Sequence, residues 1–312
     1  MLSENQITQF RADGFLVVED VLDQAQILDP VRAEYDQLLQ GLIEDWGLAT
    51  ALQDASFTER LTVAYAKGLD WFQPMDISLP GDRIFADTSM HFGPAVFEML
   101  RASKLLDIVQ SLIGPEITSN PIQHVRIKPP EVILDADEIR AHVGSTSWHQ
   151  DRAVALEEAD QTQMVTVWIA VTDANVDNGC LQVIPNKHDA ILLHCPYKQT
   201  AIAQGQIDTD LAVPLPVKSG GIVLLDPMVP HASLPNVSNG IRWSFDLRFN
   251  VTGQPTGRGH FPEFVARSAQ NPESELTDWR AWRAMWEATR SRLAETSHID
   301  IHRWRSDAPT CA

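Results

Sequence analysis

Two histidines and one aspartate are the residues of this chain whose types and spacing are best suited to hold a metal ion. His149 and Asp151 are two residues apart, and in an extended strand this spacing places both side chains on one face. His231 follows 80 residues after Asp151. Two imidazoles and one carboxylate that leave three coordination positions open form the facial triad of non-heme Fe(II) oxygenases. The pattern therefore predicts that His149, Asp151 and His231 are catalytic residues that bind one Fe(II) ion.

Arg242, eleven residues after His231, is the candidate anchor for an anionic cosubstrate. It lies in a segment whose alternation predicts a strand, with Ser244 and Arg248 on the same polar face. A buried guanidinium is costly unless it meets an anion, and its planar fork fits a carboxylate. A dicarboxylic acid that chelates iron at one end needs such a partner at its other end, and Ser244 can donate its hydroxyl to the same group. Periodicity alone does not choose between the two arginines, and the alternative for Arg248 is an ion pair with a neighbour such as Asp246.

Two other functions are compatible with a metal site in a strand-rich chain. One is a cupin-type site that holds Zn(II) or another ion for hydrolysis or isomerisation, and the spacing between His231 and Arg242 argues against it. The other is a β-barrel that binds a ligand without catalysis, and the complete set of three ligands argues against it. We therefore expect an enzyme that uses Fe(II), O2 and an anionic cosubstrate.

The elements that must position these residues change in kind along the chain. Helical signals come first: a capping box at Ser3 and Gln6, a helix end at Gly14, helical spacing over 24–46, and a helix pair over 94–113. Beyond about residue 120 the pattern changes to short strands, and residues 48–90 have no clear pattern. The expected strands are 15–18, 165–171, 180–184, 222–225 and 241–251, and a last helix is expected over 273–294.

Two side-chain patterns indicate where the core lies. In 241–251 the apolar residues share one face, and in 273–294 three tryptophans form a stripe that we expect to pack inward. The apolar face consists of Ile241, Trp243, Phe245, Leu247, Phe249 and Val251, and the stripe of Trp279, Trp282 and Trp286.

Helices followed by strands predict a mainly β core with flanking helices. No linker is evident, so we expect one domain: a mainly helical layer over 1–118, the β core over 119–252, and a C-terminal helix and tail over 253–312. Residues 48–92 and the loop 129–147 are expected to form the rim of the substrate pocket.

The composition argues against several classes of partner. The formal net charge is −18, with 42 acidic and 24 basic residues, so nucleic acid and anionic membranes are not expected partners. The three cysteines lack metal-type spacing and are expected to be free thiols in a reducing compartment. The N-terminal residues lack the pattern of a signal peptide, and no apolar run approaches a membrane span. These features predict a soluble, cytoplasmic protein, and the metal-dependent enzyme expected above would act on a small-molecule substrate.

The chain resembles the phytanoyl-CoA dioxygenase family of Fe(II)/2-oxoglutarate oxygenases. The similarity extends over most of residues 3–251 and is weak in 48–92 and in the C-terminal tail. The matching stretches are Ser147-Trp148-His149-Gln150-Asp151, Trp168, Asp177-Asn178-Gly179-Cys180-Leu181, Pro185-Asn186-Lys187-His188, His231-Ala232-Ser233 and Arg242, together with the N-terminal helix that leads into Gly14-Phe15-Leu16-Val17-Val18.

The resemblance implies a double-stranded β-helix, which is a cupin-like jelly roll, and an oxidation that converts 2-oxoglutarate and O2 to succinate and CO2. His149, Asp151 and His231 match the family's iron ligands, and Arg242 matches its 2-oxoglutarate anchor. Ser233 and Trp168 match positions that line the 2-oxoglutarate pocket. Lys128, in Lys128-Pro129-Pro130, matches a recurrent segment of the family and is a further candidate for cosubstrate binding. The family's halogenases lack the carboxylate ligand, so the presence of Asp151 favours hydroxylation or a related oxidation.

Overall fold

Two antiparallel sheets form the centre of the computed structural model, which describes residues 1–81, 83–131, 144–186, 188–196, 199–296, 299–301 and 303–304. The larger sheet has the order β1-β8-β3-β10-β2-β11 and the smaller has the order β7-β4-β9. The larger sheet consists of β1 (Phe15–Val18), β8 (Ile222–Leu225), β3 (Met164–Ala170), β10 (Arg242–Val251), β2 (Glu116–Lys128) and β11 (Phe264–Ser268). The smaller consists of β7 (Val213–Leu215), β4 (Leu181–Val183) and β9 (His231–Ser233), and a separate hairpin joins β5 (His194–Pro196) to β6 (Thr200–Ile202).

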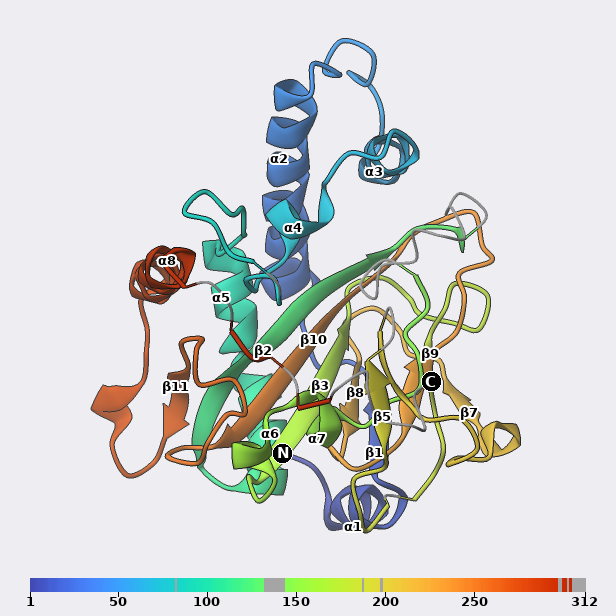
Figure 1. Cartoon of the computed structure of the whole chain (residues 1–312), viewed down its shortest axis with the longest axis vertical. Coiled ribbons are helices and arrows are strands. Elements are labelled where there is room, and N and C mark those ends of the chain that lie inside the picture. Colours follow the sequence, from blue (N-terminus) through green and yellow to red (C-terminus); the bar gives the residue numbers. More distant parts are fainter. Residues whose placement is uncertain are drawn as a thin grey trace.

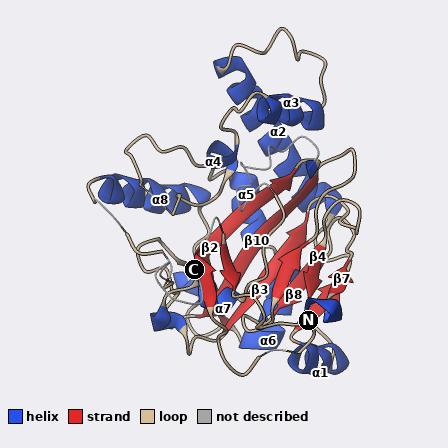
Figure 2. Ribbon diagram, turned by 45° about the vertical axis from the view of Figure 1, so that its right-hand side comes forward, coloured by secondary structure: helices blue, strands red, loops and turns tan. Residues whose placement is uncertain are grey.

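This arrangement is the jelly roll that the family resemblance implied, with the flanking helices that the sequence pattern predicted (Figure 1, Figure 2). The strands β1 and β11 belong to the larger sheet although they lie outside residues 119–252. The expected strands at 15–18, 165–171, 180–184, 222–225 and 241–251 are present with ends shifted by at most one residue.

The alternation of β10 explains how one sheet serves both core and site. Trp243, Phe245, Leu247 and Phe249 belong to the main hydrophobic cluster, in which the helices pack against the sheet. Arg242 and the other polar residues of β10 therefore project from the opposite face, toward the interior between the two sheets. In Figure 1 the long strands β2 and β10 run side by side, with α5 (Pro94–Leu100) and α6 (Ser103–Ile113) beside them.

The N-terminal helices mostly follow their sequence signals. Helix α1 (Glu4–Asp13) begins with the capping box of Ser3 and Gln6, and Gly14 ends it with a φ of 79°. The continuous helix expected over 24–46 is instead a π-helical turn, η1 (Gln24–Leu28), followed by α2 (Asp29–Asp45). Pro30 explains the difference, because a proline has no N–H to donate within a continuing helix and is tolerated in a first turn.

The remaining helices lie around the sheets. Residues 48–90, which lacked a clear pattern, contain α3 (Phe57–Ala66) and α4 (Phe72–Met75). The last helix, α8 (Trp279–Ala294), begins later than expected, because Asp278 caps it and a 3₁₀ turn, η5 (Pro272–Ser274), precedes it. Short turns complete the chain: α7 (Asp151–Val154), η3 (Glu157–Ala159) and η4 (Thr209–Leu211). Within the described residues, no helix has the length and apolar character needed to span a bilayer.

One of the two cysteines among the described residues differs from its expected state. Cys180 is a buried free thiol, as predicted. Cys195 is disulfide-bonded, so the expectation of three free thiols is wrong. Disulfide formation depends on which segments meet in space, which cysteine spacing does not reveal.

Candidate metal centre and adjoining cavities

The side chains of His149, Asp151 and His231 converge between the two sheets. One ligand atom from each lies within 4.8 Å of the others. Nε2 of His149 is 3.7 Å from one carboxylate oxygen of Asp151, and Nε2 of His231 is 3.8 Å from the other. All three residues are buried. Two nitrogens and one carboxylate at these separations fit a single divalent ion of the kind expected from the sequence.

Backbone carbonyls fix both imidazoles in the orientation that a metal requires. Nδ1 of His149 lies 2.8 Å from the carbonyl oxygen of Ser147, and Nδ1 of His231 lies 3.1 Å from that of Val229. A carbonyl can only accept, so each Nδ1 carries the proton and each Nε2 presents a lone pair toward Asp151. Burial, followed by the nearby His149, lowers the pKa of His231 to about 4, so that His231 is neutral at pH 7.

The local backbone brings the ligands together in a way that differs from a single strand. His149 pairs with His231 through two backbone hydrogen bonds of 3.0 Å, in a bridge outside the longer strands. Asp151 is the first residue of the helical turn α7, so the expectation that His149 and Asp151 share one strand is wrong. Gln150 between them is extended, with φ −110° and ψ 133°, and this single extended residue keeps both side chains on one side.

Asp151 is held as a carboxylate by its neighbours. Arg248 donates from Nη2 to one of its oxygens and Thr166 donates its hydroxyl to the other. Burial alone would raise the pKa of Asp151, but Arg248 and His231 hold it well below its usual range. The alternative considered for Arg248, an ion pair with its neighbour Asp246, is secondary, because that separation is 3.9 Å and the closer partner is Asp151.

Arg242 borders a small cavity next to the triad and has no acidic partner. Among the described residues no carboxylate lies within ion-pair distance of it, and its Nε atom has no hydrogen-bond partner. Its guanidinium carbon lies 5.3 Å from the centre of the Trp168 ring. Burial, and then the charge of Arg126, lowers the pKa of Arg242 to about 9, so it is still a cation at pH 7. Such a buried, unpaired cation fits the carboxylate of a bound acid.

The other predicted cosubstrate residues divide into two groups. Ser233 and Trp168 line the same cavity as Arg242, together with His149 and His231. Ser244 and Lys128 are absent from its lining. Ser244 accepts a 2.6 Å hydrogen bond from Nη1 of Arg242, and thereby fixes the guanidinium rather than reaching the cavity itself.

Lys128 acts on the cavity through Ser233. Its Nζ atom donates to the Ser233 hydroxyl oxygen at 2.9 Å and to the Leu234 carbonyl at 2.6 Å. The backbone N–H of Thr146 also donates to that hydroxyl oxygen, at 2.8 Å. With two donors already on the oxygen, the Ser233 hydroxyl hydrogen is left to donate to an acceptor. Burial, and then the charge of Arg242, lowers the pKa of Lys128 to about 6.

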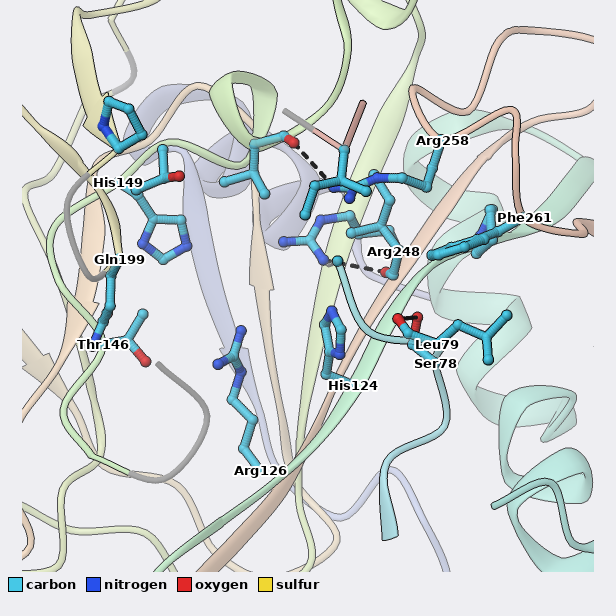
Figure 3. Close-up of a pocket in the computed structure, with 17 residues that line it drawn as sticks. Ser78, Leu79, His124, Arg126, Thr146, His149, Gln199, Arg248, Arg258 and Phe261 are labelled. Atoms are coloured by element: carbon cyan, nitrogen blue, oxygen red, sulfur yellow. Dashed lines mark hydrogen bonds between the residues drawn. The ribbon is translucent and has the colours of Figure 1, made fainter. Parts of the chain in front are cut away.

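A second cavity, of about 360 Å³, is also bordered by His149 (Figure 3). His149, Arg126 and Thr146 border both cavities, so the two adjoin at the metal centre. The expected pocket rim contributes to it through Ser78, Leu79 and Gly81 from 48–92 and through Thr146 from 129–147. Residues 132–143 of that loop lie outside the described part of the chain.

Sequence reasoning missed several residues of the site. Thr166 lies in β3 and contacts Asp151. Arg126 alternates with Lys128 in β2, a signal that could have placed it in the interior. Gln150 is fully buried and bonds His194, Met228 and Leu192. Arg258 lies outside any regular element and carried no local signal. The sequence therefore singled out the three clustered residues His149, Asp151 and His231, but not the side chains that support them.

Comparison with known proteins gives one consistent result. The family model for phytanoyl-CoA dioxygenase (PhyH) matches residues 10–244. Phytanoyl-CoA dioxygenase domain-containing protein 1 of Mus musculus is 33% identical over 272 residues, which cover 79% of this chain and 89% of that protein. Its homolog from Dictyostelium discoideum is 26% identical over 274 residues, with coverages of 80% and 91%. The peroxisomal phytanoyl-CoA dioxygenase of Bos taurus is 23% identical over 286 residues, with coverages of 89% and 76%.

Solved structures with low sequence identity share the fold. The apo form of the non-heme monooxygenase ThoJ has a TM-score of 0.57 and 19% identity, over 94% of this chain and 98% of that chain. EvdO2 from Micromonospora carbonacea var. aurantiaca, complexed with 2-oxoglutarate, has a TM-score of 0.53 and 20% identity, over 81% and 92%. The epimerase SnoN, in complex with Fe3+, alpha ketoglutarate and nogalamycin RO, has a TM-score of 0.52 and 17% identity, over 81% and 86%.

Proposed function

Because this chain belongs to the phytanoyl-CoA dioxygenase family, we propose that it is an Fe(II)- and 2-oxoglutarate-dependent dioxygenase that hydroxylates, or otherwise oxidises, a small organic substrate. The observation that supports this most is the pairing of two features in one cavity. His149 and His231 line this cavity and lie with Asp151 as three clustered ligand atoms, and Arg242, which lines the same cavity, is a buried cation without an acidic partner among the described residues. A metal chelator with a distant carboxylate satisfies both features at once.

In this proposal the residues have distinct tasks. His149, Asp151 and His231 hold Fe(II), which with 2-oxoglutarate and O2 supplies the oxidising chemistry and releases succinate and CO2. Arg242 binds the carboxylate of 2-oxoglutarate that is remote from the metal, and the Ser233 hydroxyl donates to the same group. Trp168 forms an apolar wall that keeps water from the carboxylate. Ser244 and Lys128 orient Arg242 and Ser233.

The supports of Asp151 favour oxygenation over halide transfer. A carboxylate that is fully buried and held by Arg248 and Thr166 is fixed at its position. With iron bound, Asp151 would supply a carboxylate ligand where a halogenase would hold its halide. We expect oxygenated and not chlorinated products, even in high chloride. The organisation of residues 1–312 as one domain and a cytoplasmic location stay predictions.

Anaerobic titration tests the proposal directly. The protein with Fe(II) should develop a visible charge-transfer band when 2-oxoglutarate is added, and O2 should then yield slow succinate formation without a prime substrate. His231→Ala, in which the cavity keeps Arg242 but loses one ligand, serves as the control and should show neither signal. A wild-type protein that binds Fe(II) but gives no band and no succinate would leave a hydrolase, an isomerase or a simple binding protein as the better reading.

A further inference from the structure

The larger cavity beside the triad has more positive than negative side chains. Three arginines line it: Arg126, Arg248 and Arg258. Two of them have acidic partners, since Arg126 donates to Asp246 at 3.0 Å and Arg248 contacts Asp151. The chain as a whole carries a net charge of −18, so this local excess of positive charge runs against its composition.

Arg258 carries that excess. Its side chain is buried, its Nη2 atom donates to the Val154 carbonyl at 3.1 Å, and its Nε atom has no partner. In the described parts of the chain no carboxylate lies within ion-pair distance of it. Burial, and then the charge of Arg248, lowers the pKa of Arg258 to about 10, which leaves it protonated at pH 7. A buried cation is costly without an anion to meet it, so the observed side chains leave one charge uncompensated.

The position of Arg258 relates it to the reaction site. In Figure 3 the guanidinium groups of Arg258, Arg248 and Arg126 point into the same space, which His149 borders. Apolar side chains complete the walls, among them Leu79, Ile122, Phe261 and Ile301. A volume of about 360 Å³ lies at the small end of the range for ligand pockets. The cavity thus offers one cation, an apolar surface and access to the metal ligands.

We propose that Arg258 binds an anionic group of the prime substrate, and that this substrate is a small amphipathic acid. The acid's carboxylate or phosphate lies against Arg258, and its apolar body contacts the side chains around Phe261 and extends toward His149. This inference rests on the proposed function, because it identifies the larger cavity as the place of the prime substrate. It concerns a different residue from Arg242, which serves the cosubstrate.

Matched anionic and neutral probes test this assignment by calorimetry on the protein loaded anaerobically with Fe(II) and 2-oxoglutarate. Octanoate is compared with octanamide, and octyl phosphate with 1-octanol, so the two pairs distinguish a carboxylate from a phosphate. At least one anion should bind about tenfold or more tightly than its neutral partner, since a charge-assisted pair with a buried guanidinium is lost in the neutral compound. If neither anion binds more tightly than its neutral partner, the proposal is overturned.

Three variants connect the preference to Arg258. Arg258→Gln should abolish the tighter binding of the anionic probe relative to its neutral partner, and Arg258→Lys should keep part of that preference. Arg283→Gln changes the net charge equally at an exposed residue that pairs with Glu287, and should leave the preference intact. A preference that persists in folded Arg258→Gln would contradict the assignment.

Should that variant fail to fold, phenylglyoxal modification of the wild-type protein decides. The preferred anion should protect Arg258 from modification and leave Arg283 reactive. A lack of protection at Arg258 refutes the proposal.

Parallel measurements of the charge-transfer band and of succinate separate the two proposals. A protein that shows both signals but no preference for anions retains the proposed function and loses this inference. A protein that shows neither signal but binds anions through Arg258 loses the proposed function and retains the anion site.

Discussion

At the scale of single residues, the two arginines of β10 illustrate how identical side chains acquire different roles. Arg242 and Arg248 lie on the same face of one strand, both buried. Arg248 contacts Asp151, and this partner raises its pKa against the opposing effect of burial. Arg242 has a serine and the ring of Trp168 as neighbours instead of an acid. Arg248 is therefore suited to hold the candidate metal ligand Asp151, and Arg242 is suited to bind the anionic group of a diffusible ligand.

Because the two arginines have different partners, we expect their alanine variants to lose affinity for different ligands. Arg242→Ala should weaken 2-oxoglutarate binding by about 2–5 kcal/mol, because the carboxylate of the cosubstrate would be buried without its partner. Arg248→Ala should chiefly weaken Fe(II) binding, by about 10–100-fold, because it removes a group that orients a metal ligand. Anaerobic titrations of metal and of 2-oxoglutarate at saturating metal measure the two constants separately. Equal losses of 2-oxoglutarate affinity in both folded variants would overturn the choice of Arg242.

At the scale of elements, helix α8 connects the aromatic core to the larger cavity. Trp286 is fully buried, and its ring stacks on Phe92 with centroids 4.9 Å apart. It also contacts Phe261 at 5.4 Å, and Phe261 lines the cavity. Trp282 is buried as well, whereas Trp279, at the start of the helix, is only partly buried. The expected inward stripe is thus fully buried at two of its three positions.

The loss of stability caused by replacing a tryptophan of α8 should increase with the burial of that tryptophan. Trp286→Ala should lower the free energy of unfolding by about 3–5 kcal/mol, because it leaves a large cavity in a well-packed cluster. The matched change Trp279→Ala removes the same side chain from a partly buried position and should cost clearly less. Chemical denaturation of both variants, followed by tryptophan fluorescence and circular dichroism, measures the difference. A Trp279→Ala protein as unstable as Trp286→Ala would show that the packing of α8 is not as described.

At the scale of the whole molecule, the candidate metal centre joins parts of the chain that otherwise belong to different layers. His231 begins β9 in the smaller sheet, whereas Asp151 contacts Thr166 and Arg248 in the larger sheet. A metal bound by His149, Asp151 and His231 would hold the two sheets together. The three side chains are close together only in the folded protein, so the ion binds the folded state more tightly than the unfolded state. Its binding therefore raises the free energy of unfolding.

Metal removal should therefore destabilise the molecule as a unit. Mn(II), used in place of Fe(II) to avoid oxidation, should stabilise the apoprotein by about 2.7 kcal/mol at a concentration 100 times its Kd. Thermal unfolding with Mn(II) and with a chelator measures this shift, and addition of 2-oxoglutarate should increase it. His231→Ala, once circular dichroism shows that it is folded, provides the control, because it lacks one of the proposed ligands. A similar Mn(II)-dependent rise in Tm in that variant would place the ion elsewhere.

The sequence by itself determined the features that depend on local spacing. The capping box of Ser3 and Gln6, the alternation of β10 and the helix pair before Gly114 arise from neighbouring residues, and each is present in the fold. The candidate metal centre of His149, Asp151 and His231 was predicted for a different reason, because His231 lies 80 residues from Asp151. Metal chemistry restricts the set of usable side chains so strongly that their order in the chain is informative.

Only the tertiary structure decided which side chains meet across distant segments. It placed Asp151 at the start of α7, gave Arg248 to that carboxylate, and left Arg242 without an acid. It also brought Arg258, from a segment without any local pattern, to the wall of the larger cavity. Burial and ion pairing depend on contacts between residues far apart in the chain, and periodicity carries no information on those contacts. A buried charge without a partner of opposite sign among the described residues, such as that of Arg242 or Arg258, can be recognised only from the side chains that the fold packs around it.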